Sequence, residues 1–281
     1  MRTWYKYLLA DANEKFSTGK DVTFAENAKT MDYARQEGLR NRQDFLSTHL
    51  AQGHIRFRIY DQLLHSILER KEKILSVASG RCVNEVVLAE EGYQITCSDL
   101  EVIAGVQKIF PQLRFAAYNL LKGAFPGDSF DAVLALQVFY LFDPAELKTA
   151  IQNLKSSLKS GGKLVVDISG AEDKWITRLI DEGVVKFEAY FKALVLRLLR
   201  KQRKIVSRKH HGFRYTDAEF VALMQKEGFG LVKVEKADYA TEWERSYVLR
   251  RLGERSRLFK RFIEWLGRPV PYIRLFIFKK V

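Results

Sequence analysis

The chain has 281 residues, of which 47% are hydrophobic and 29% charged, an ordinary composition for a globular protein. This length allows one α/β domain with additions, or two small domains. Two cysteines, Cys82 and Cys97, are too few for a metal-ligand cluster, and they fit a reducing compartment better than a secreted scaffold. No segment is apolar enough for a signal peptide or for a membrane span of ~20 residues. We therefore expect a cytoplasmic protein without a metal site.

Positive charge is concentrated in the last third of the chain. Residues 1–183 carry 23 Lys and Arg against 24 Asp and Glu, whereas residues 184–281 carry 24 against 10. The formal net charge of +13 therefore comes from the last third alone. Such asymmetry indicates contact with a polyanion, either a nucleic acid or an anionic membrane surface. A solvated basic face would have the same composition.

The first 72 residues have apolar side chains at helical spacing and are expected to form helices. Ile55, Ile59, Leu63 and Ile67 recur every four residues. From residue 73 the pattern changes to strands that alternate with helices. The expected strands cover residues 73–77, 93–98, 113–118, 130–137 and 163–169, and the expected helices cover 83–92, 101–110 and 144–159. This alternation implies right-handed crossover connections and a parallel sheet.

Residues 171–281 continue with a different balance of elements. A long helical stretch is expected to reach about residue 205, and a helix follows with Thr216 and Glu219 as its capping box. Strands are expected at 231–239 and 273–280. Between them, residues 242–267 are helical and basic, so the segment 240–271 should lie outside the sheet.

Ligands of a parallel α/β sheet bind at the carboxyl ends of its strands, and polar or small residues follow four of the predicted strands. The first strand runs into the loop "ASGRC", in which four of five residues are small and allow close approach of a cofactor. Asp99 ends the second strand, placed to accept hydrogen bonds from two ribose hydroxyls, with Glu101 close behind it. Asn119 and Leu120 follow the third strand, and Gln137 follows the fourth.

Together these segments resemble the class I S-adenosylmethionine-dependent methyltransferases. "ILSVASGRC" stands at the family's glycine-rich loop, and "ITCSDLE" matches its acidic second-strand end. "GDSFDAVLALQVFYLF" matches its fourth-strand segment, and "LKSSLKSGGKLVVDI" matches the entry into its fifth strand. The resemblance implies a Rossmann-like, doubly wound, mostly parallel seven-stranded sheet with an antiparallel last strand. It also implies three parts: a helical lid at 1–72, a cofactor-binding half at 73–170 and the remaining sheet with basic helical additions at 171–281.

The resemblance assigns each matching residue a role toward S-adenosylmethionine, whose product is S-adenosylhomocysteine. The loop would pack against the methionine part, Asp99 would hold the ribose, and Gln137 would lie near the methyl-bearing sulfur. The full cofactor-binding set is Ala78, Ser79, Gly80, Asp99, Leu100, Asn119, Leu120 and Gln137, with Asn119 and Leu120 holding the adenine.

The chain departs from the family pattern at three loop positions. Ser76 replaces the usual acid, Ala78 replaces the first glycine and Cys82 replaces the third. Loss of the acid removes a charge that organises the amino end of the cofactor. Glu85, one turn into the next helix, is a partial substitute, or else an ordinary solvated helix residue.

No motif marks the base that would accept a proton from the methyl acceptor. The candidates are His210 and His211, ahead of the sixth-strand unit, and Tyr140; each is equally compatible with a structural role. The acceptor must be inferred from the basic additions, and a small or lipid-linked compound, an RNA and a soluble metabolite all remain open. Residues 184–204 and 243–267 combine cations with large apolar side chains, which predicts association with an anionic membrane surface. A non-catalytic binding protein on the same scaffold is the alternative to an enzyme.

Overall fold

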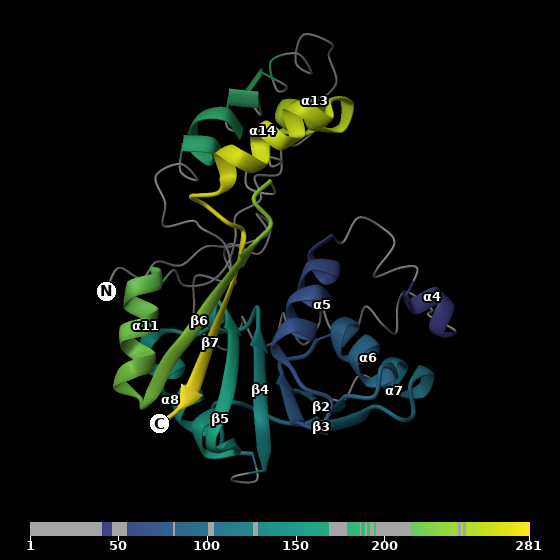
Figure 1. Cartoon of the computed structure of the whole chain (residues 1–281), viewed down its shortest axis with the longest axis vertical. Helices are drawn as coiled ribbons and strands as arrows, with labels where there is room; N and C mark the ends of the chain where they lie inside the picture. The colour runs from purple at the N-terminus through teal and green to yellow at the C-terminus, as the bar shows by residue number, and fades with distance from the viewer. Residues whose placement is uncertain are drawn as a thin grey trace.

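The computed structural model describes residues 41–46, 55–80, 82–100, 104–125, 129–168, 179–185, 187–188, 190–191, 194, 215–240, 243 and 246–281. Seven strands in this part of the chain form one sheet in the order β3-β2-β1-β4-β5-β7-β6 (Figure 1). The strands are β1 (Lys73–Val77), β2 (Gln94–Asp99), β3 (Arg114–Ala117), β4 (Phe130–Leu136), β5 (Leu158–Asp167), β6 (Phe229–Ala237) and β7 (Ile273–Lys280).

The first five strands pair in parallel, and β7 runs antiparallel to both β5 and β6. The strand order reverses between β1 and β4, since β2 and β3 lie on one side of β1 and the later strands on the other. The expected Rossmann-like fold with an antiparallel last strand is confirmed. The reversal also places the carboxyl ends of β1 and β4 at the point where such sheets bind ligands.

Helices cover both faces of the sheet. On one face lie α4 (Arg42–Leu46), α5 (Ile55–Ile67), α6 (Val83–Glu90) and α7 (Ala104–Ile109); on the other lie α8 (Pro144–Ser157) and α11 (Asp217–Lys226) (Figure 1). Strand β1 is buried on both faces of the sheet. Ile74 packs in the core on the α5 and α6 side, whereas Leu75 and Val77 pack in the core on the α8 and α11 side. A strand buried on both faces has a continuous apolar sequence, as "KILSV" nearly does.

Two helix starts follow directly from local sequence. Asp143 caps α8 by accepting from Ala145 N and Glu146 N, both at 2.9 Å, with Pro144 at the first helical position. Thr216 and Glu219 form the predicted capping box of α11, and Glu219 N donates to Thr216 Oγ1 at 3.2 Å.

Two predicted boundaries were wrong. Helix α8 ends at Ser157 and β5 begins at once with Leu158, so Gly161 and Gly162 lie inside the strand instead of ending the helix. Buried Leu158 pairs with Phe130, and a register shift before Ala132 absorbs the extra length. The basic segment 242–267 is helical as expected, and its described residues include two helices.

The two basic helices are α13 (Tyr247–Arg255) and α14 (Arg257–Gly267), and they lie beyond the end of the sheet as expected (Figure 1). Ser256 separates them with an extended backbone and caps α14, since Phe259 N donates to its Oγ at 3.3 Å. The short π-helix η4 (Ile180–Val185) lies earlier in the chain. None of the described helices is long and apolar enough to cross a membrane.

Candidate functional site

The loop after β1 has a left-handed backbone at alternate residues. The φ angles are 50° at Ala78, 53° at Gly80 and 55° at Cys82. Left-handed backbone costs a residue with a side chain roughly 1–2 kcal/mol, so glycine usually takes these positions. Here alanine and cysteine take the same conformation, which means that the loop keeps the shape of a glycine-rich turn with only one glycine.

Hydrogen bonds tie this loop to the end of β2. Ser79 N donates to Ser98 O at 3.0 Å, and Gly80 N donates to Asp99 Oδ2 at 2.9 Å. Leu100 N donates to the other carboxylate oxygen of Asp99 at 2.7 Å. Burial raises the pKa of Asp99, and the two backbone donors oppose that rise. A carboxylate has about four lone-pair sites, so two remain for ribose hydroxyls.

The predicted adenine-binding residues lie next along the same edge. Tyr118 N donates to Asp99 O at 2.7 Å, which holds the end of β3 beside the end of β2. Asn119 Oδ1 accepts from Leu121 N at 2.9 Å, so this oxygen shapes its own turn and keeps one lone pair for another donor. Leu120 is buried.

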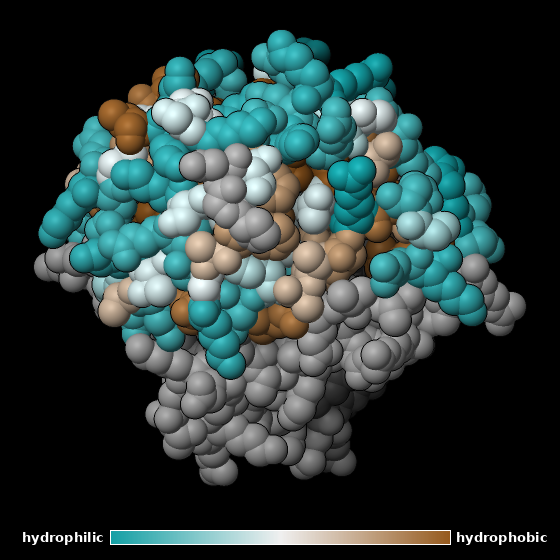
Figure 2. All heavy atoms as spheres, turned by 90° about the horizontal axis from the view of Figure 1, so that it is seen from below, coloured by the Kyte–Doolittle hydropathy of each residue, from teal (hydrophilic) through white to brown (hydrophobic). Residues whose placement is uncertain are grey.

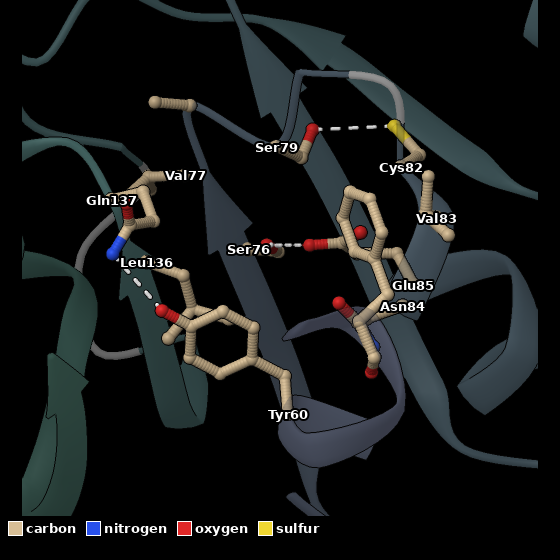
Figure 3. Close-up of a pocket in the computed structure, with 12 residues that line it drawn as sticks. Tyr60, Ser76, Val77, Ser79, Cys82, Val83, Asn84, Glu85, Leu136 and Gln137 are labelled. Atoms are coloured by element: carbon tan, nitrogen blue, oxygen red, sulfur yellow. Dashed lines mark hydrogen bonds between the residues drawn. The ribbon is translucent and has the colours of Figure 1, made fainter. Parts of the chain in front are cut away.

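A cavity of about 200 Å³ opens between the β1 loop, helix α5 and the end of β4 (Figure 3). The described residues that line it are Phe57, Tyr60, Ser76, Val77, Ala78, Ser79, Cys82, Val83, Asn84, Glu85, Leu136 and Gln137. Of the predicted set it includes Ala78, Ser79 and Gln137, whereas the other five lie at the ends of β1, β2 and β3 and are not among the lining residues. Cavities that enclose a whole drug-sized ligand hold about 300–1,000 Å³, so this one has room for only part of a cofactor.

A larger hollow of about 500 Å³ lies at the opposite edge of the sheet. It is lined by charged residues and by the start of β5, including Glu69, Lys71, Asp131 and Lys159. Lys159 Nζ donates to Asp131 Oδ1 at 2.7 Å there, and Lys73 N donates to Asp131 Oδ2 at 2.9 Å. Because this is the amino edge of the parallel strands, we place the site at the smaller cavity.

Glu85 lies on the wall of the cavity and is only 5% exposed. The expectation of an ordinary solvated residue was therefore wrong. Ser76 Oγ donates to Glu85 Oε1 at 2.6 Å, so the serine that replaces the usual acid touches the acid one turn into α6 (Figure 3). Burial raises the pKa of Glu85, and the Ser76 hydrogen bond partly opposes it. A buried carboxylate beside a cavity favours a cation as its partner.

A second buried polar group adjoins the same cavity. Tyr60 of α5 and Gln137 at the end of β4 both donate hydrogen bonds to the Asp167 carboxylate at the end of β5. Gln137 Nε2 also donates to Tyr60 Oη at 3.0 Å (Figure 3). Asp167 is fully buried and Tyr60 is 2% exposed. Gln137 has a positive φ of 57°, so the backbone is strained where its side chain turns toward this group.

Sequence reasoning missed Tyr60 and Asp167. The signal available for Asp167 was an acid directly after the apolar run "KLVV", at a strand end that faces the ligand edge. Tyr60 gave no comparable signal, because it reaches the group from a helix 107 residues away in sequence.

Of the predicted bases, Tyr140 lies on the short helix η3 (Phe139–Leu141), half-buried, and is not among the residues that line the cavity. His210, His211 and Glu101 lie outside the described residues. In the part of the chain that the structure describes, no group of three His, Cys, Asp or Glu could hold a metal ion. The roles of the predicted site residues stay predictions.

The model of the methyltransferase domain family matches residues 52–234, about two thirds of the chain. The chain belongs to this methyltransferase family. Its cofactor is S-adenosylmethionine. A search of the curated proteins finds no match.

Solved structures with the same fold share little sequence with this methyltransferase. A 1,6-didemethyltoxoflavin-N1-methyltransferase from Burkholderia thailandensis, solved with 1,6-didemethyltoxoflavin and S-adenosylhomocysteine, is 14% identical, with a TM-score of 0.50. That match covers 85% of this chain and 87% of the other. The PH0226 protein from Pyrococcus horikoshii is 15% identical over 82% and 92% of the two chains, with a TM-score of 0.51. These likenesses show the fold alone.

The residues at the site fit the cofactor. Glu85 would hold the ammonium group of its methionine end inside the cavity, where the small loop residues Ala78 and Ser79 leave room. Asp99 would hold the ribose at the open edge with its remaining lone pairs. The left-handed turns at Ala78, Gly80 and Cys82 would let the loop backbone approach the cofactor closely.

Proposed function

We infer that this methyltransferase transfers a methyl group to a proton-bearing atom of a small or lipid-linked acceptor. The observation that carries the proposal is the buried group of Tyr60, Gln137 and Asp167 beside the cavity. Phe57, Leu136 and other hydrophobic side chains also line the cavity, which helps to exclude water from the relay.

When bound, S-adenosylmethionine supplies an activated methyl group on a sulfonium, so the protein mainly aligns the reactants and excludes water. A nitrogen or oxygen of the acceptor would receive this methyl group, and the electron pair of the broken carbon–sulfur bond would stay on the sulfur. The acceptor atom must then lose its proton. Tyr60 takes that proton on its oxygen and passes its own to the Asp167 carboxylate, with which it is already hydrogen-bonded.

Gln137 positions this relay. Its amide donates to both Tyr60 and Asp167, which fixes the phenol oxygen relative to the carboxylate. The same side chain lines the cavity between the β1 loop and the relay. An acceptor that enters from the open edge therefore meets Tyr60 and the methionine end of the cofactor together.

The first test identifies the acceptor class. Purified protein is incubated with radiolabelled S-adenosylmethionine and separate lipid, water-soluble and RNA fractions of a cell extract. Label in the lipid or small-molecule fraction supports the proposal. Label only in RNA supports an RNA methyltransferase, and binding of S-adenosylhomocysteine with no label in any fraction supports a binding protein.

The second test examines the relay on the labelled acceptor. Tyr60→Phe and Asp167→Asn are expected to lower kcat by about 10²–10⁴-fold, the usual contribution of acid–base catalysis. Affinity for S-adenosylhomocysteine should stay near that of the wild type. Tyr93→Phe is the matched control, because Tyr93 is also a buried tyrosine but does not line the cavity, and its kcat should be unchanged. A group that is only structural would instead lower the melting temperature and cofactor affinity without a selective loss of kcat.

A further inference from the structure

Exposed apolar side chains gather in one part of the methyltransferase. Fourteen large hydrophobic side chains are exposed among the described residues, and eleven of them lie in segments 179–194 and 247–265. These eleven are Leu179, Phe187, Tyr190, Phe191, Leu194, Tyr247, Val248, Leu252, Leu258, Phe262 and Trp265. We call α13, α14 and the described residues of 179–194 the helical cap.

Helix α14 has a packed side and an exposed apolar side. Ile263 is buried against Gly253 of α13, whereas Leu258, Phe262 and Trp265 are 78%, 50% and 60% exposed. These three residues follow the spacing i, i+4 and i+7, so they form one stripe along the helix. The rings of Phe262 and Trp265 stack with centroids 6.1 Å apart. A stripe of this kind that faces away from the core needs another apolar partner.

Exposed cations lie on α13 and on α14, the helix that carries the stripe. Residues 247–268 carry seven exposed Lys and Arg but only two acids, Glu254 and Glu264. The cations are Arg250, Arg251, Arg255, Arg257, Lys260, Arg261 and Arg268. On a helical projection Arg257, Arg261 and Arg268 flank one side of the apolar stripe. A strongly basic face next to a strip of Leu, Phe and Trp is the composition of helices that lie in the plane of a membrane surface.

The parts of the cap are fixed to one another and to the sheet. Glu188 accepts from Tyr247 N at 2.8 Å and from Val248 N at 3.3 Å, so it caps α13 from the earlier segment. At the other end, α14 approaches the chain after β6 so closely that a side chain at Gly267 would collide with Tyr239 O. The cap is thus joined through Glu188 and packs against the chain after β6 at Gly267.

The cap lies on the ligand-binding side of the sheet. Strand β6 runs parallel to β5, since both are antiparallel to β7, and the cap follows its carboxyl end (Figure 1). The cavity lies at the carboxyl ends of β1 and β4, which belong to the same edge. Figure 2 shows the opposite end of the molecule, where the described residues present a mainly hydrophilic surface. Apolar exposure and the site therefore share one end.

We propose that the helical cap docks on an anionic lipid bilayer, with the stripe of Leu258, Phe262 and Trp265 in the headgroup region and the flanking cations on lipid phosphates. Nucleic acid would satisfy the cations, but it offers no partner for aliphatic residues such as Leu258, Val248 and Leu252. Docking would turn the carboxyl edge toward the membrane, so that the acceptor is drawn from the lipid phase. That last step rests on the proposed function, whereas docking itself does not.

The test is sedimentation of the full-length protein with two kinds of vesicle, without cofactor. One kind contains phosphatidylcholine alone and the other contains phosphatidylcholine with phosphatidylglycerol. Wild-type protein should sediment with the anionic vesicles and much less with the neutral ones. Phe262→Ser combined with Trp265→Ser should weaken partitioning about tenfold or more per residue, because each buries one large apolar side chain. Reversal of Arg250, Arg251, Arg257 and Arg261 to Glu should weaken it by roughly fivefold or more per residue.

The matched controls are Val232→Ser, an exposed apolar residue of β6 outside the cap, and Lys108→Gln, an exposed cation on α7. Both should sediment as the wild type does, and every variant should still bind S-adenosylhomocysteine, which shows that it folds. Wild-type protein that stays in the supernatant with both vesicles at low salt overturns the proposal, as does an unaffected serine pair. Tight RNA binding that falls steeply with salt, without vesicle binding, assigns the cap to RNA. Vesicle binding with methyl label only in water-soluble compounds overturns the membrane-acceptor step alone.

Discussion

At the scale of single residues, the acid that the family pattern has at the end of β1 is absent, and another residue of the site supplies a carboxylate. Ser76 removes a carboxylate from the end of β1, and Glu85 returns one from α6 to the same wall of the cavity, 2.6 Å from the serine hydroxyl. The backbone behaves similarly, since Ala78 and Cys82 adopt the left-handed conformation of the glycines they replace. The chain thus keeps the shape and charge of the loop with different residues.

Glu85→Gln is expected to stabilise the cofactor-free protein and to weaken its binding of the cofactor. Burial raises the pKa of Glu85 in the folded protein above its value in the unfolded chain. The folded protein is therefore most stable at low pH, where Glu85 is protonated, and it loses stability as pH rises through the folded-state pKa. The variant should therefore melt at a higher temperature at neutral pH. Its affinity for S-adenosylhomocysteine should fall by about 1.5–3 kcal/mol, the value of a charged hydrogen bond. Calorimetry measures both, with Glu90→Gln, at the exposed end of the same helix and outside the cavity lining, as the control.

Unchanged affinity in a folded Glu85→Gln protein would mean that the ammonium group lies elsewhere. A lower melting temperature would mean that the carboxylate is stabilised by a partner within the fold. The two readouts therefore separate binding from stability.

Asp99→Ala should weaken cofactor binding by a similar amount, about 1.5–3 kcal/mol. The variant loses the ribose contact and also releases Gly80 N, which holds the loop against β2. Asp131→Ala is the matched control, because Asp131 also accepts a backbone N–H and lies at the amino edge of the sheet. An Asp99→Ala protein that folds and binds S-adenosylhomocysteine as the wild type does would remove Asp99 from the site.

At the scale of elements, α5 is the helix that closes the cavity. Asn84 Nδ2 of α6 donates to Phe57 O of α5 at 2.8 Å, and His65 of α5 reaches Glu91, just beyond α6. Because Tyr60 lies between these two contacts, they set the position of the proposed relay. The contacts join helices that are neighbours in sequence, yet nothing in either helical pattern alone specifies the pairing.

The His65 contact should make stability depend on pH near neutrality. The hydrogen bond to Glu91 raises the pKa of His65, and its bond to the Asp61 carbonyl adds to this. A raised pKa means that the stabilisation is complete below the unfolded value of about 6.5 and is lost as pH rises through the folded value. The loss should not exceed about 1 kcal/mol, because both side chains are partly exposed. Urea unfolding across this range measures it, and His65→Gln should abolish the difference; parallel profiles would contradict the assignment.

The local sequence pattern predicted the strands, because each is an apolar run bounded by turn residues. The alternation of strands with helices predicted that the first five are parallel. The local pattern failed where burial overrides local preference, as at Leu158, which begins a strand although the helical spacing continues. Within the site, Asp99 and Gln137 could be predicted because each lies at the end of a parallel strand, and the carboxyl ends of such strands meet at one edge of the sheet. Asp167 had the same strand-end signal, whereas Tyr60 required the tertiary structure, because its contact with Asp167 depends on how α5 packs on the sheet.

At the scale of the whole molecule, charge and apolar exposure are both polarised. Residues 1–183 are nearly neutral, and the large positive excess follows them. Helices α13 and α14 carry six Lys and Arg against two Glu at the edge that also holds the cavity, whereas the opposite end is mainly hydrophilic (Figure 2). Self-repulsion of clustered cations lowers stability, so an arrangement of this kind favours a neutralising surface. The orientation on that surface follows from the stripe on α14.

Trp265 offers a direct reading of that orientation. It is 60% exposed at the end of the stripe, so in water its indole is largely hydrated. Anionic vesicles should shift the fluorescence emission to the blue as the ring enters the headgroup region, where Trp is favoured. Trp265→Phe should abolish most of the shift yet still sediment with vesicles, because phenylalanine keeps the apolar contact. A shift that persists in Trp265→Phe would place another tryptophan at the membrane and would contradict the orientation in which α14 faces the bilayer.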